Sequence, residues 1–495
     1  MFRSVAILLT LMIAGSGSLL PLAGQTYQPN WASLDKRGTP QWFTDSKFGI
    51  IVHWGVYSVP AYAPVGVPKE QPYAEWYWHS LTVGRDGSDP NVTGAWKFHE
   101  RVYGSNFPYQ SFAPMFKAEL FDPQAWADLF QRSGAKYVVL TSKHHDGFAL
   151  WPSKEASSTW RRPWNSTEIG PHRDVVGELT TAVRGKGLKM GLYYSLYEWA
   201  NPLWLSDKHQ YVSQHMTPQF KDLVTRYKPS IIFADGEWDL PSSEWHSPEL
   251  LAWLFNDSAV KDEVVINDRW GKETRHKHGG YWTTEYTPGM ASVDHVWEEN
   301  RGMGYSYGYN RAEKLEQYHS GRDLVLMLVD TVSRGGNLLL DVGPAADGSI
   351  PVVMEERLVE IGSWLRINGD AIYGSHAMAS PRQYSEGELP KTSFNERFMV
   401  PYDVAALVDH TRPGKAAVDA FFTAKNDSVY AVLPEWHSGD FTLHMPNTSR
   451  IGSVTLLGYR SPLRFRQMGT DVTVELPELP DALRVQPAWT LEMKP

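Results

Sequence analysis

Carboxylates that directly follow apolar runs are the residues of this sequence best suited to chemistry. The apolar run Ile231–Asp235 ends in Asp235 and is followed by Gly236, Glu237 and Trp238. A carboxylate at the end of a buried strand can act as a general base, a nucleophile or a metal ligand. This pattern therefore makes Asp235 a candidate catalytic residue.

An arginine and a second carboxylate follow in the next two apolar runs. Arg269 lies in the stretch Asn267–Gly271, where it could keep a neighbouring carboxylate ionised and could bind a hydroxyl group. Glu285 lies next to Tyr286 and close to Trp282, and such aromatic neighbours could raise its pKa by desolvation. Two carboxylates with differently tuned pKa values are what glycoside hydrolysis needs.

The adjacent histidines His144 and His145 raise the alternative of a metal site. Neighbouring residues of a strand point to opposite faces, so they bind one ion only where a bulge redirects them. The sequence contains no Cys and no HExxH motif. It also lacks a GxSxG motif, a P-loop and a dinucleotide-binding fingerprint after a strand. We therefore expect the histidines to bind a polyhydroxylated ligand by hydrogen bonds, without a metal or cofactor.

The elements that must position these side chains are eight short apolar runs, most of them apolar almost throughout. Such runs are typical of parallel strands that are buried on both faces. Helical patterns lie between several of them, although little helix separates the sixth run from the seventh, and the alternation predicts a (β/α)8 barrel. The runs are Phe48–Trp54, Tyr137–Lys143, Met190–Ser195, Ile231–Asp235, Val264–Asp268, Tyr281–Glu285, His295–Glu298 and Asn337–Val342.

In barrels of this kind the active site lies at the carboxyl ends of the strands. Any one polar residue there could simply be a strand end that meets solvent, but their joint concentration predicts a site. The polar residues at these ends are His53, His144, His145, Tyr193, Asp235, Arg269, Glu285 and Glu298.

The sequence pattern changes after Tyr373. Short runs that alternate apolar and polar residues predict a small antiparallel β-sandwich, which could support the barrel or bind sugar. The predicted strands include Phe421–Lys425, Ser428–Leu433, Phe441–Met445, Ser453–Tyr459, Val472–Leu476 and Leu483–Val485. The predicted division is an export signal over 1–24, a barrel over 25–380, a linker over 381–392 and a sandwich over 393–495.

The first residues have the pattern of an export signal. Arg3 is followed by the apolar run Val5–Ala14, which is too short to span a bilayer, and by small residues up to Gly24. We expect a periplasmic or secreted protein, with a lysosomal type of route only in a eukaryote. No later stretch is apolar for long enough to suggest a membrane partner.

The amino-acid composition further limits the classes of molecule that the protein is expected to bind. The net charge of −9 argues against a nucleic-acid-binding surface. The 21 Trp and 24 Tyr are a weak indication of carbohydrate binding, because aromatic faces stack on the C–H faces of sugars, although a large barrel also uses aromatic residues in its core. The sequence does not predict an oligomeric state.

Nine motifs, taken in order, resemble those of the retaining α-L-fucosidases over nearly the whole mature chain. The Asp-Gly-Glu-Trp form is similar to that of the lysosomal and related bacterial members, a branch of broad specificity. The motifs are Lys47–Gly55, Glu75–Tyr77, Lys143–Phe148, Tyr193–Ser195, Asp235–Trp238, Asn267–Gly271, Trp297–Glu298, Gly308–Asn310 and Ser333–Leu340.

The resemblance implies an exo-acting hydrolase of terminal α-L-fucose that works through a fucosyl-enzyme intermediate. It implies that Asp235 is the nucleophile and Glu285 the acid/base, with Glu298 as the rival and Glu237 as a more distant one. A fucose-binding lectin on the same barrel and a transfucosidase are the alternatives. The positions that the resemblance assigns to fucose contacts are His53, Glu75, Trp76, His144, His145, Tyr193 and Arg269, with Phe233 where the bacterial pattern has tryptophan.

Overall fold

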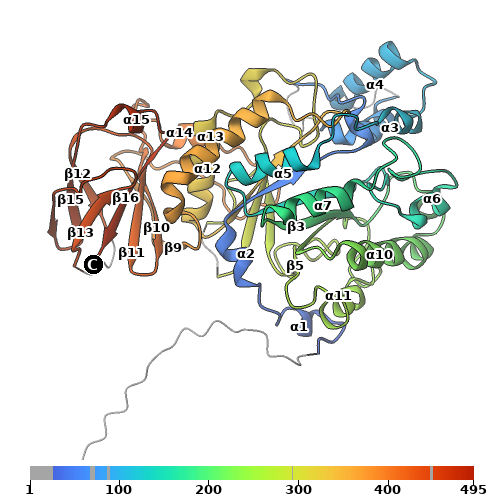
Figure 1. Cartoon of the computed structure of the whole chain (residues 1–495), viewed down its shortest axis with the longest axis horizontal. Helices are drawn as coiled ribbons and strands as arrows, with labels where there is room; N and C mark the ends of the chain where they lie inside the picture. Colours follow the sequence, from blue (N-terminus) through green and yellow to red (C-terminus); the bar gives the residue numbers. More distant parts are fainter. Residues whose placement is uncertain (1–25, 67–72, 86–89, 292–293, 446–449) are drawn as a thin grey trace, which may run out of the picture.

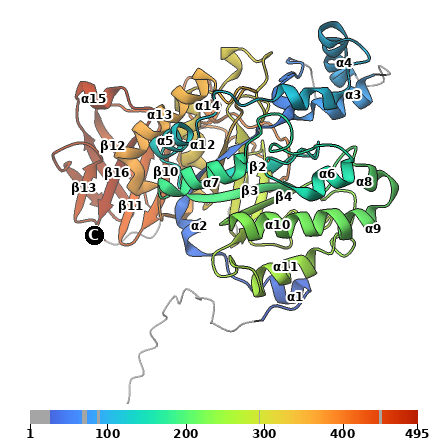
Figure 2. The ribbon, with the colours of Figure 1, turned by 45° about the vertical axis from the view of Figure 1, so that its right-hand side comes forward.

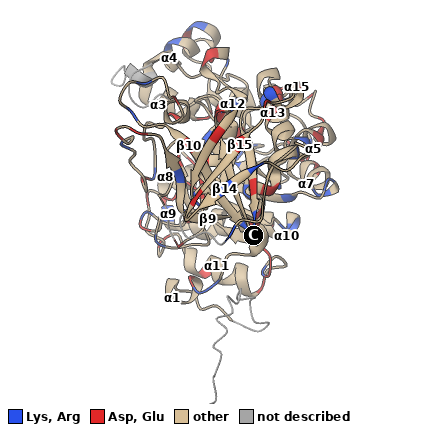
Figure 3. Ribbon diagram, turned by 90° about the vertical axis from the view of Figure 1, so that its left-hand side faces the viewer, with Lys and Arg blue, Asp and Glu red and all other residues tan. Residues whose placement is uncertain are grey.

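The computed structural model describes residues 26–66, 73–85, 90–291, 294–445 and 450–495. The predicted export signal lies outside these residues and stays a prediction. None of the described helices is both long and apolar enough to cross a membrane. Lys and Arg are interspersed with Asp and Glu along the ribbon (Figure 3).

The larger part of the chain is built on a parallel sheet of eight strands in the order β5-β4-β3-β2-β1-β8-β7-β6. All eight predicted strands are present, and β2, β4 and β8 have the predicted bounds. Figure 1 shows these strands surrounded by helices. The strands are β1 (Phe48–Val52), β2 (Tyr137–Lys143), β3 (Lys189–Ser195), β4 (Ile231–Asp235), β5 (Val265–Ile266), β6 (Trp282–Glu285), β7 (Trp297–Gly302) and β8 (Asn337–Val342).

The two end strands of this sheet, β5 and β6, approach each other through residues outside the regular ladder. The Ile266 carbonyl accepts hydrogen bonds from the N–H groups of Gly280 and Tyr281, both at 3.2 Å. On the other side of β5, the Asn267 side chain donates to the Ala234 carbonyl at 2.8 Å and accepts from the Ala234 N–H at 3.1 Å. A side-chain amide thus extends the pairing where the short β5 has ended. These contacts close the barrel and confirm the predicted fold class.

Helices cover the outside of the barrel (Figure 2), and most of them lie where the sequence has a helical pattern. Asp122 begins α5 by accepting from the N–H groups of Gln124 and Ala125, with Pro123 in the first turn. Among the described residues, no helix lies between β5 and β6 or between β6 and β7. The helices are α5 (Pro123–Arg132), α7 (Val175–Gly185), α10 (Thr217–Tyr227), α11 (Ser247–Asn256), α12 (Gly321–Ser333) and α13 (Val352–Asn368).

Helix α12 was not predicted, and its surroundings explain why. Every residue from Leu324 to Ser333 is buried, so the helix has no polar face to give a helical period. Figure 1 shows α12 and α13 between the barrel strands and the C-terminal sheets. The helix is therefore covered on both sides by protein.

The C-terminal part contains two antiparallel sheets, which confirm the predicted sandwich. Strand order is β13-β16-β11-β10-β9 in one sheet and β12-β15-β14 in the other. The strands are β9 (His376–Tyr384), β10 (Val418–Lys425), β11 (Ser428–Leu433), β12 (Gly439–His444), β13 (Ser453–Leu456), β14 (Phe465–Met468), β15 (Asp471–Leu476) and β16 (Trp489–Lys494).

Two details of this part differ from the sequence prediction. The predicted strand Leu483–Val485 was wrong, because these residues overlap the short helix α15 (Asp481–Arg484) and its C-terminal cap. Strand β9 pairs with β10, although it begins within the range given to the barrel and extends past residue 381, where the linker was expected. A strand that mixes polar and apolar residues without strict alternation gives little signal. The division into domains stays a prediction.

A buried ion cluster around Asp330 joins α12 to the C-terminal part. The Asp330 carboxylate accepts from Arg334 at 2.8 Å, from Arg382 of β9 at 2.7 Å and from the Tyr402 hydroxyl. Burial alone would raise the pKa of Asp330, but the two guanidinium groups lower it to about 2. One carboxylate thus pairs with two buried cations.

We expect Asp330→Ala to destabilise the protein by about 3–5 kcal/mol, because it leaves two buried guanidinium groups without a counter-ion. The free energy of unfolding in urea, followed by tryptophan fluorescence, measures this loss. Glu360→Ala is the control, since Glu360 is 51% exposed in its pair with Arg357, and its loss should cost no more than about 1 kcal/mol. Equal effects of the two substitutions would contradict this role of Asp330.

Candidate active site

A cavity of about 350 Å³ opens at the carboxyl ends of the barrel strands. Its volume lies within the range of small-molecule sites. Charged and aromatic side chains share its wall, as expected for a site that binds a polar ligand with apolar faces. The lining residues are His53, Tyr73, Glu75, Trp76, His144, Tyr193, Phe233, Asp235, Trp238, Arg275, Glu285, Asn300, Tyr307 and Phe398.

Asp235 ends β4 and turns its carboxylate into this cavity, where Gly236 at φ +73° allows the chain to leave the strand sharply. Oδ2 accepts from the Tyr193 hydroxyl at 2.7 Å, and Oδ1 accepts from Arg269 at 3.0 Å. Burial alone would raise the pKa of Asp235, but the positive charge of Arg269, followed by His145 and Arg275, holds it below its usual value. Asp235 is therefore an ionised, oriented carboxylate.

Glu285 ends β6 and shares the same arginine. One terminal nitrogen of Arg269 donates to Asp235, and the other lies 2.5 Å from Glu285 Oε1. The Arg269 Nε donates to the Thr283 hydroxyl at 2.9 Å, so the guanidinium is held on three sides. A single planar group therefore spans the two carboxylates and sets their separation.

Glu298 lies outside the cavity, because its position in β7 is two residues deeper in the barrel than the level of Glu285. In the register of β6 and β7, Thr283 pairs with Glu298, whereas Glu285 pairs with Asn300. Glu298 accepts from the Tyr137 hydroxyl and does not line the cavity. Burial raises its pKa to about 8.

Glu237, the more distant rival, is also withdrawn from the cavity. It is buried and accepts from Arg275 Nε at 2.6 Å. Arg275 itself lines the cavity, and its Nη2 lies 3.7 Å from Asp235 Oδ1. Glu237 thus fixes a second cation beside Asp235.

The three predicted histidines lie together but differ in their contacts. His53 Nδ1 lies 2.6 Å from Asp341 Oδ1, and His145 Nδ1 lies 2.6 Å from the Ser195 hydroxyl. Burial lowers the pKa of all three, to about 3 for His53 and about 4 for His145, so they are neutral near pH 7. The described residues contain no group of three His, Cys, Asp or Glu placed to hold a metal ion.

Most of the other predicted contact residues line the cavity. Glu75 accepts from the Gly308 N–H at 2.9 Å, and burial raises its pKa to about 8. Phe233 packs under Arg269, whose guanidinium carbon lies 4.7 Å from the ring centre. Arg269 and His145 are exceptions, because they lie behind the wall and contact Asp235. Both residues therefore support the Asp235 carboxylate from behind the wall.

Sequence reasoning missed several residues of the wall. Tyr73 and Arg275 lie in loops without a motif. Asn300 lies in β7 beyond the predicted end of that strand, and Tyr307 lies in the loop after it. Phe398 comes from the range that was assigned to the sandwich. The bridge that places Phe398 pairs it with Glu285, 113 positions earlier in the chain, so local sequence gave no signal for it.

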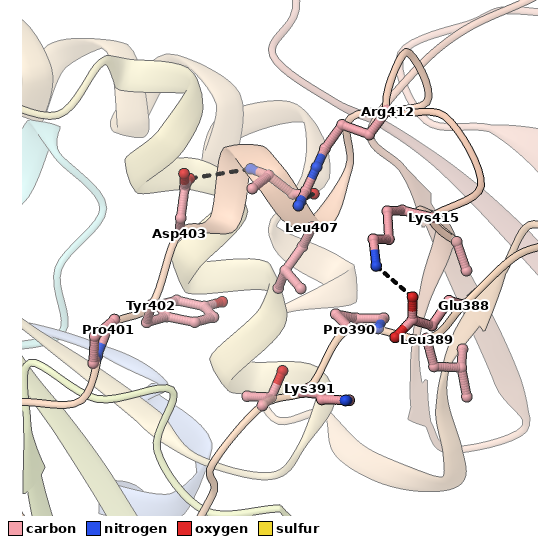
Figure 4. A pocket seen from close by; sticks show the side chains of 13 residues that line it. Glu388, Leu389, Pro390, Lys391, Pro401, Tyr402, Asp403, Leu407, Arg412 and Lys415 are labelled. Carbon is pink, nitrogen blue, oxygen red and sulfur yellow. Dashed lines mark hydrogen bonds and ion pairs between the residues drawn. The ribbon is translucent and has the colours of Figure 1, made fainter.

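A second cavity, of about 370 Å³, lies in the C-terminal part (Figure 4). Lys415 forms an ion pair with Glu388 on its wall, and Asp403 accepts from the Ala406 N–H. Its lining residues include no pair of carboxylates on one arginine. We therefore place the active site in the barrel cavity.

A barrel with two carboxylates on one arginine at the carboxyl ends of its strands is the arrangement of a carbohydrate-hydrolysing enzyme. The family model "Alpha-L-fucosidase" matches residues 18–370, and the model "Alpha-L-fucosidase C-terminal domain" matches residues 415–494. The chain belongs to the α-L-fucosidase family. It is a glycoside hydrolase, as the sequence predicted.

Individual relatives agree with this assignment. The tissue α-L-fucosidase of Rattus norvegicus is 40% identical over 98% of this chain and 96% of its own. An α-L-fucosidase of Dictyostelium discoideum is 47% identical over 72% of this chain and 76% of its own. A crystal structure of Thermotoga maritima α-fucosidase in complex with fucose is 34% identical and covers 94% of this chain and all of the other, with a TM-score of 0.73.

We expect Arg269→Gln to move the acidic limb of the kcat/KM profile to higher pH. The guanidinium stabilises the ionised form of Asp235, so its removal raises the pKa of that carboxyl and leaves more of it protonated at a given pH. The profile is measured with an aryl α-L-fucoside.

Arg275→Gln is the matched control, because Arg275 lies farther from Asp235 and should move the limb less, in the same direction. Circular dichroism verifies that both variants are folded. An acidic limb that stays in place in folded Arg269→Gln would show that Arg269 does not control the charge of Asp235.

Proposed function

We propose that this chain is an exo-acting, retaining α-L-fucosidase in which Asp235 is the nucleophile and Glu285 the acid/base. The observation that supports these roles is the Arg269 guanidinium, which contacts both carboxylates at the wall of one cavity. A retaining pair must lie about 5–5.5 Å apart, and contact with one guanidinium brings the two carboxylates close enough together to form such a pair. The cavity has room for a terminal sugar, which fits exo action.

In the first step Asp235 attacks the anomeric carbon of fucose. The bond from this carbon to the glycosidic oxygen breaks, and Glu285 gives its proton to the departing oxygen. Asp235 is suited to attack because Arg269 keeps it ionised and the Tyr193 hydroxyl orients it. The product of this step is a fucosyl ester of Asp235.

In the second step Glu285, now ionised, takes a proton from water. The water oxygen attacks the anomeric carbon, the ester bond breaks and Asp235 leaves as a carboxylate. Two displacements give net retention. Arg269 contacts both groups throughout, so it can stabilise whichever carboxylate carries the charge.

Glu285 is favoured over Glu298 by position and by partners. Glu285 lines the cavity, whereas Glu298 is buried behind it against Tyr137. A general acid must reach the leaving oxygen within hydrogen-bond distance. We assign Glu298 a structural role in the barrel interior.

The neutral histidines and the aromatic wall fit recognition of fucose. His144 Nδ1 is buried without a partner among the described residues, so a substrate hydroxyl can pair with it. His53 is oriented by Asp341 and can bond a second hydroxyl through its other nitrogen. Glu75, Trp76, Tyr193 and Phe233 complete this wall. We propose that the substrates are fucosylated glycans and that residues 1–24 are the export signal of the chain.

Asp235→Gly should lower kcat by several orders of magnitude and leave the binding of fucose largely intact, because only the attacking group is lost. Added azide can occupy the vacated space, and should partly restore turnover of an aryl fucoside and give a fucosyl azide of inverted, β, configuration. Nuclear magnetic resonance identifies the product. Near-normal turnover without azide would exclude Asp235 as the nucleophile.

Glu285→Ala should hydrolyse a natural fucosyl disaccharide far worse than an activated aryl fucoside, since a good leaving group needs little protonation. Azide should here yield the retained, α, product. Glu298→Ala is the control, and should depress both substrates to a similar degree. If the dependence on leaving group appears in Glu298→Ala and is absent from Glu285→Ala, the two assignments must be exchanged.

A further inference from the structure

A segment of the C-terminal part, residues 394–402, pairs with the end of β6 beside the proposed acid/base. The Glu285 N–H donates to the Arg397 carbonyl at 3.1 Å, and the Met399 N–H donates to the Glu285 carbonyl at 2.9 Å. The Val400 N–H donates to the Tyr286 carbonyl at 3.0 Å. Phe398, between the two bonded positions, is therefore the parallel-bridge partner of Glu285.

Both ends of this segment are fastened to the barrel. The Phe394 ring lies 5.1 Å from the guanidinium carbon of Arg334 and 5.6 Å from that of Arg382. At the other end the Tyr402 hydroxyl donates to Asp330, the centre of the buried ion cluster. These anchors place Phe398 independently of its own side chain.

The Phe398 side chain lines the catalytic cavity and is 45% exposed. An aromatic ring in this position has one face in water, and burial of that face against a ligand would be favourable. Most of the neighbouring aromatic wall is already packed, as the stacked pair of His53 and Tyr307 shows. The exposed ring of Phe398 is thus available for contact with a bound molecule.

The side of the cavity on which Phe398 lies identifies what it would contact. In a retaining reaction the leaving group departs on the face of the sugar where the acid/base stands, opposite the nucleophile. Phe398 is the strand partner of Glu285, whereas the other exposed aromatic residue of the wall, Trp238, follows Asp235 in the chain. Phe398 is therefore next to the departing group.

We propose that Phe398 is a specificity-determining contact for the leaving group, a platform for an aryl ring or for the C–H face of the sugar to which fucose is joined. This inference rests on the proposed role of Glu285 as the acid/base. It places part of substrate selection in the C-terminal part of the chain, outside the barrel. Fucose itself, bound at the wall of neutral histidines, does not depend on this ring.

The test compares Phe398→Ala with the wild type on three substrates that differ in leaving group. They are an aryl α-L-fucoside, a fucosyl disaccharide and α-L-fucosyl fluoride, whose leaving group is a single small ion. We expect kcat/KM to fall roughly tenfold for the first two, the size of a lost stacking contact, and to stay within about twofold for the fluoride. Inhibition by free fucose should be unchanged, and Phe398→Tyr should retain wild-type values.

Leu389→Ala is the matched control, because Leu389 is an exposed apolar residue of the same part of the chain and lines the second cavity. It should leave all three substrates unaffected. The backbone bonds to Glu285 do not involve the Phe398 side chain, so the variant should fold, which its melting temperature verifies.

Two outcomes would overturn the proposal. Equal losses on all three substrates would show that Phe398 only supports the site, and no loss on any of them would show that it does not touch the leaving group. Failure of the underlying mechanism is visible separately, because it would appear in the azide products of the Glu285 and Asp235 variants and not in the substrate preference of Phe398→Ala.

Discussion

The Arg269 guanidinium, which contacts Asp235 with one nitrogen and Glu285 with another, is the interaction on which the site depends. A buried cation is costly unless it is paired, and here two carboxylates pair with it. The arginine in turn keeps Asp235 ionised in a place where burial would otherwise protonate it. The same group thus keeps Asp235 ionised, orients it and holds Glu285 beside it.

The barrel supplies this geometry through the ends of three neighbouring elements. Asp235 ends β4, Arg269 follows the short β5, and Glu285 ends β6, where β5 and β6 close the barrel. The Asn267 amide extends the pairing with β4, so the chain can leave the ladder early and place Arg269 behind the cavity wall, in contact with Asp235 and Glu285. The irregular backbone where β5 and β6 close the barrel therefore positions Arg269.

The sequence predicted the barrel well because parallel strands buried on both faces are continuous apolar runs, and Asp235, Arg269 and Glu285 follow such runs. It could not separate Glu285 from Glu298, since that choice depends on the register of β6 and β7. It missed α12, which has no polar face, and Phe398, which reaches the site only through long-range backbone pairing. Periodicity identifies elements that have one side in the core and the other in water. Helix α12 is buried on all sides, and the segment around Phe398 is positioned by distant residues, so neither shows such a pattern.

The role of Asp235 is tested most directly by trapping the covalent intermediate. A 2-deoxy-2-fluoro-α-L-fucosyl fluoride forms a long-lived ester with the nucleophile of a retaining enzyme, because the fluorine slows its hydrolysis. Peptide mapping by mass spectrometry after inactivation then locates the fucosyl group. We predict the label on Asp235, in the peptide that contains Gly236 and Glu237. A label on Glu285, Glu298 or another carboxylate would contradict it.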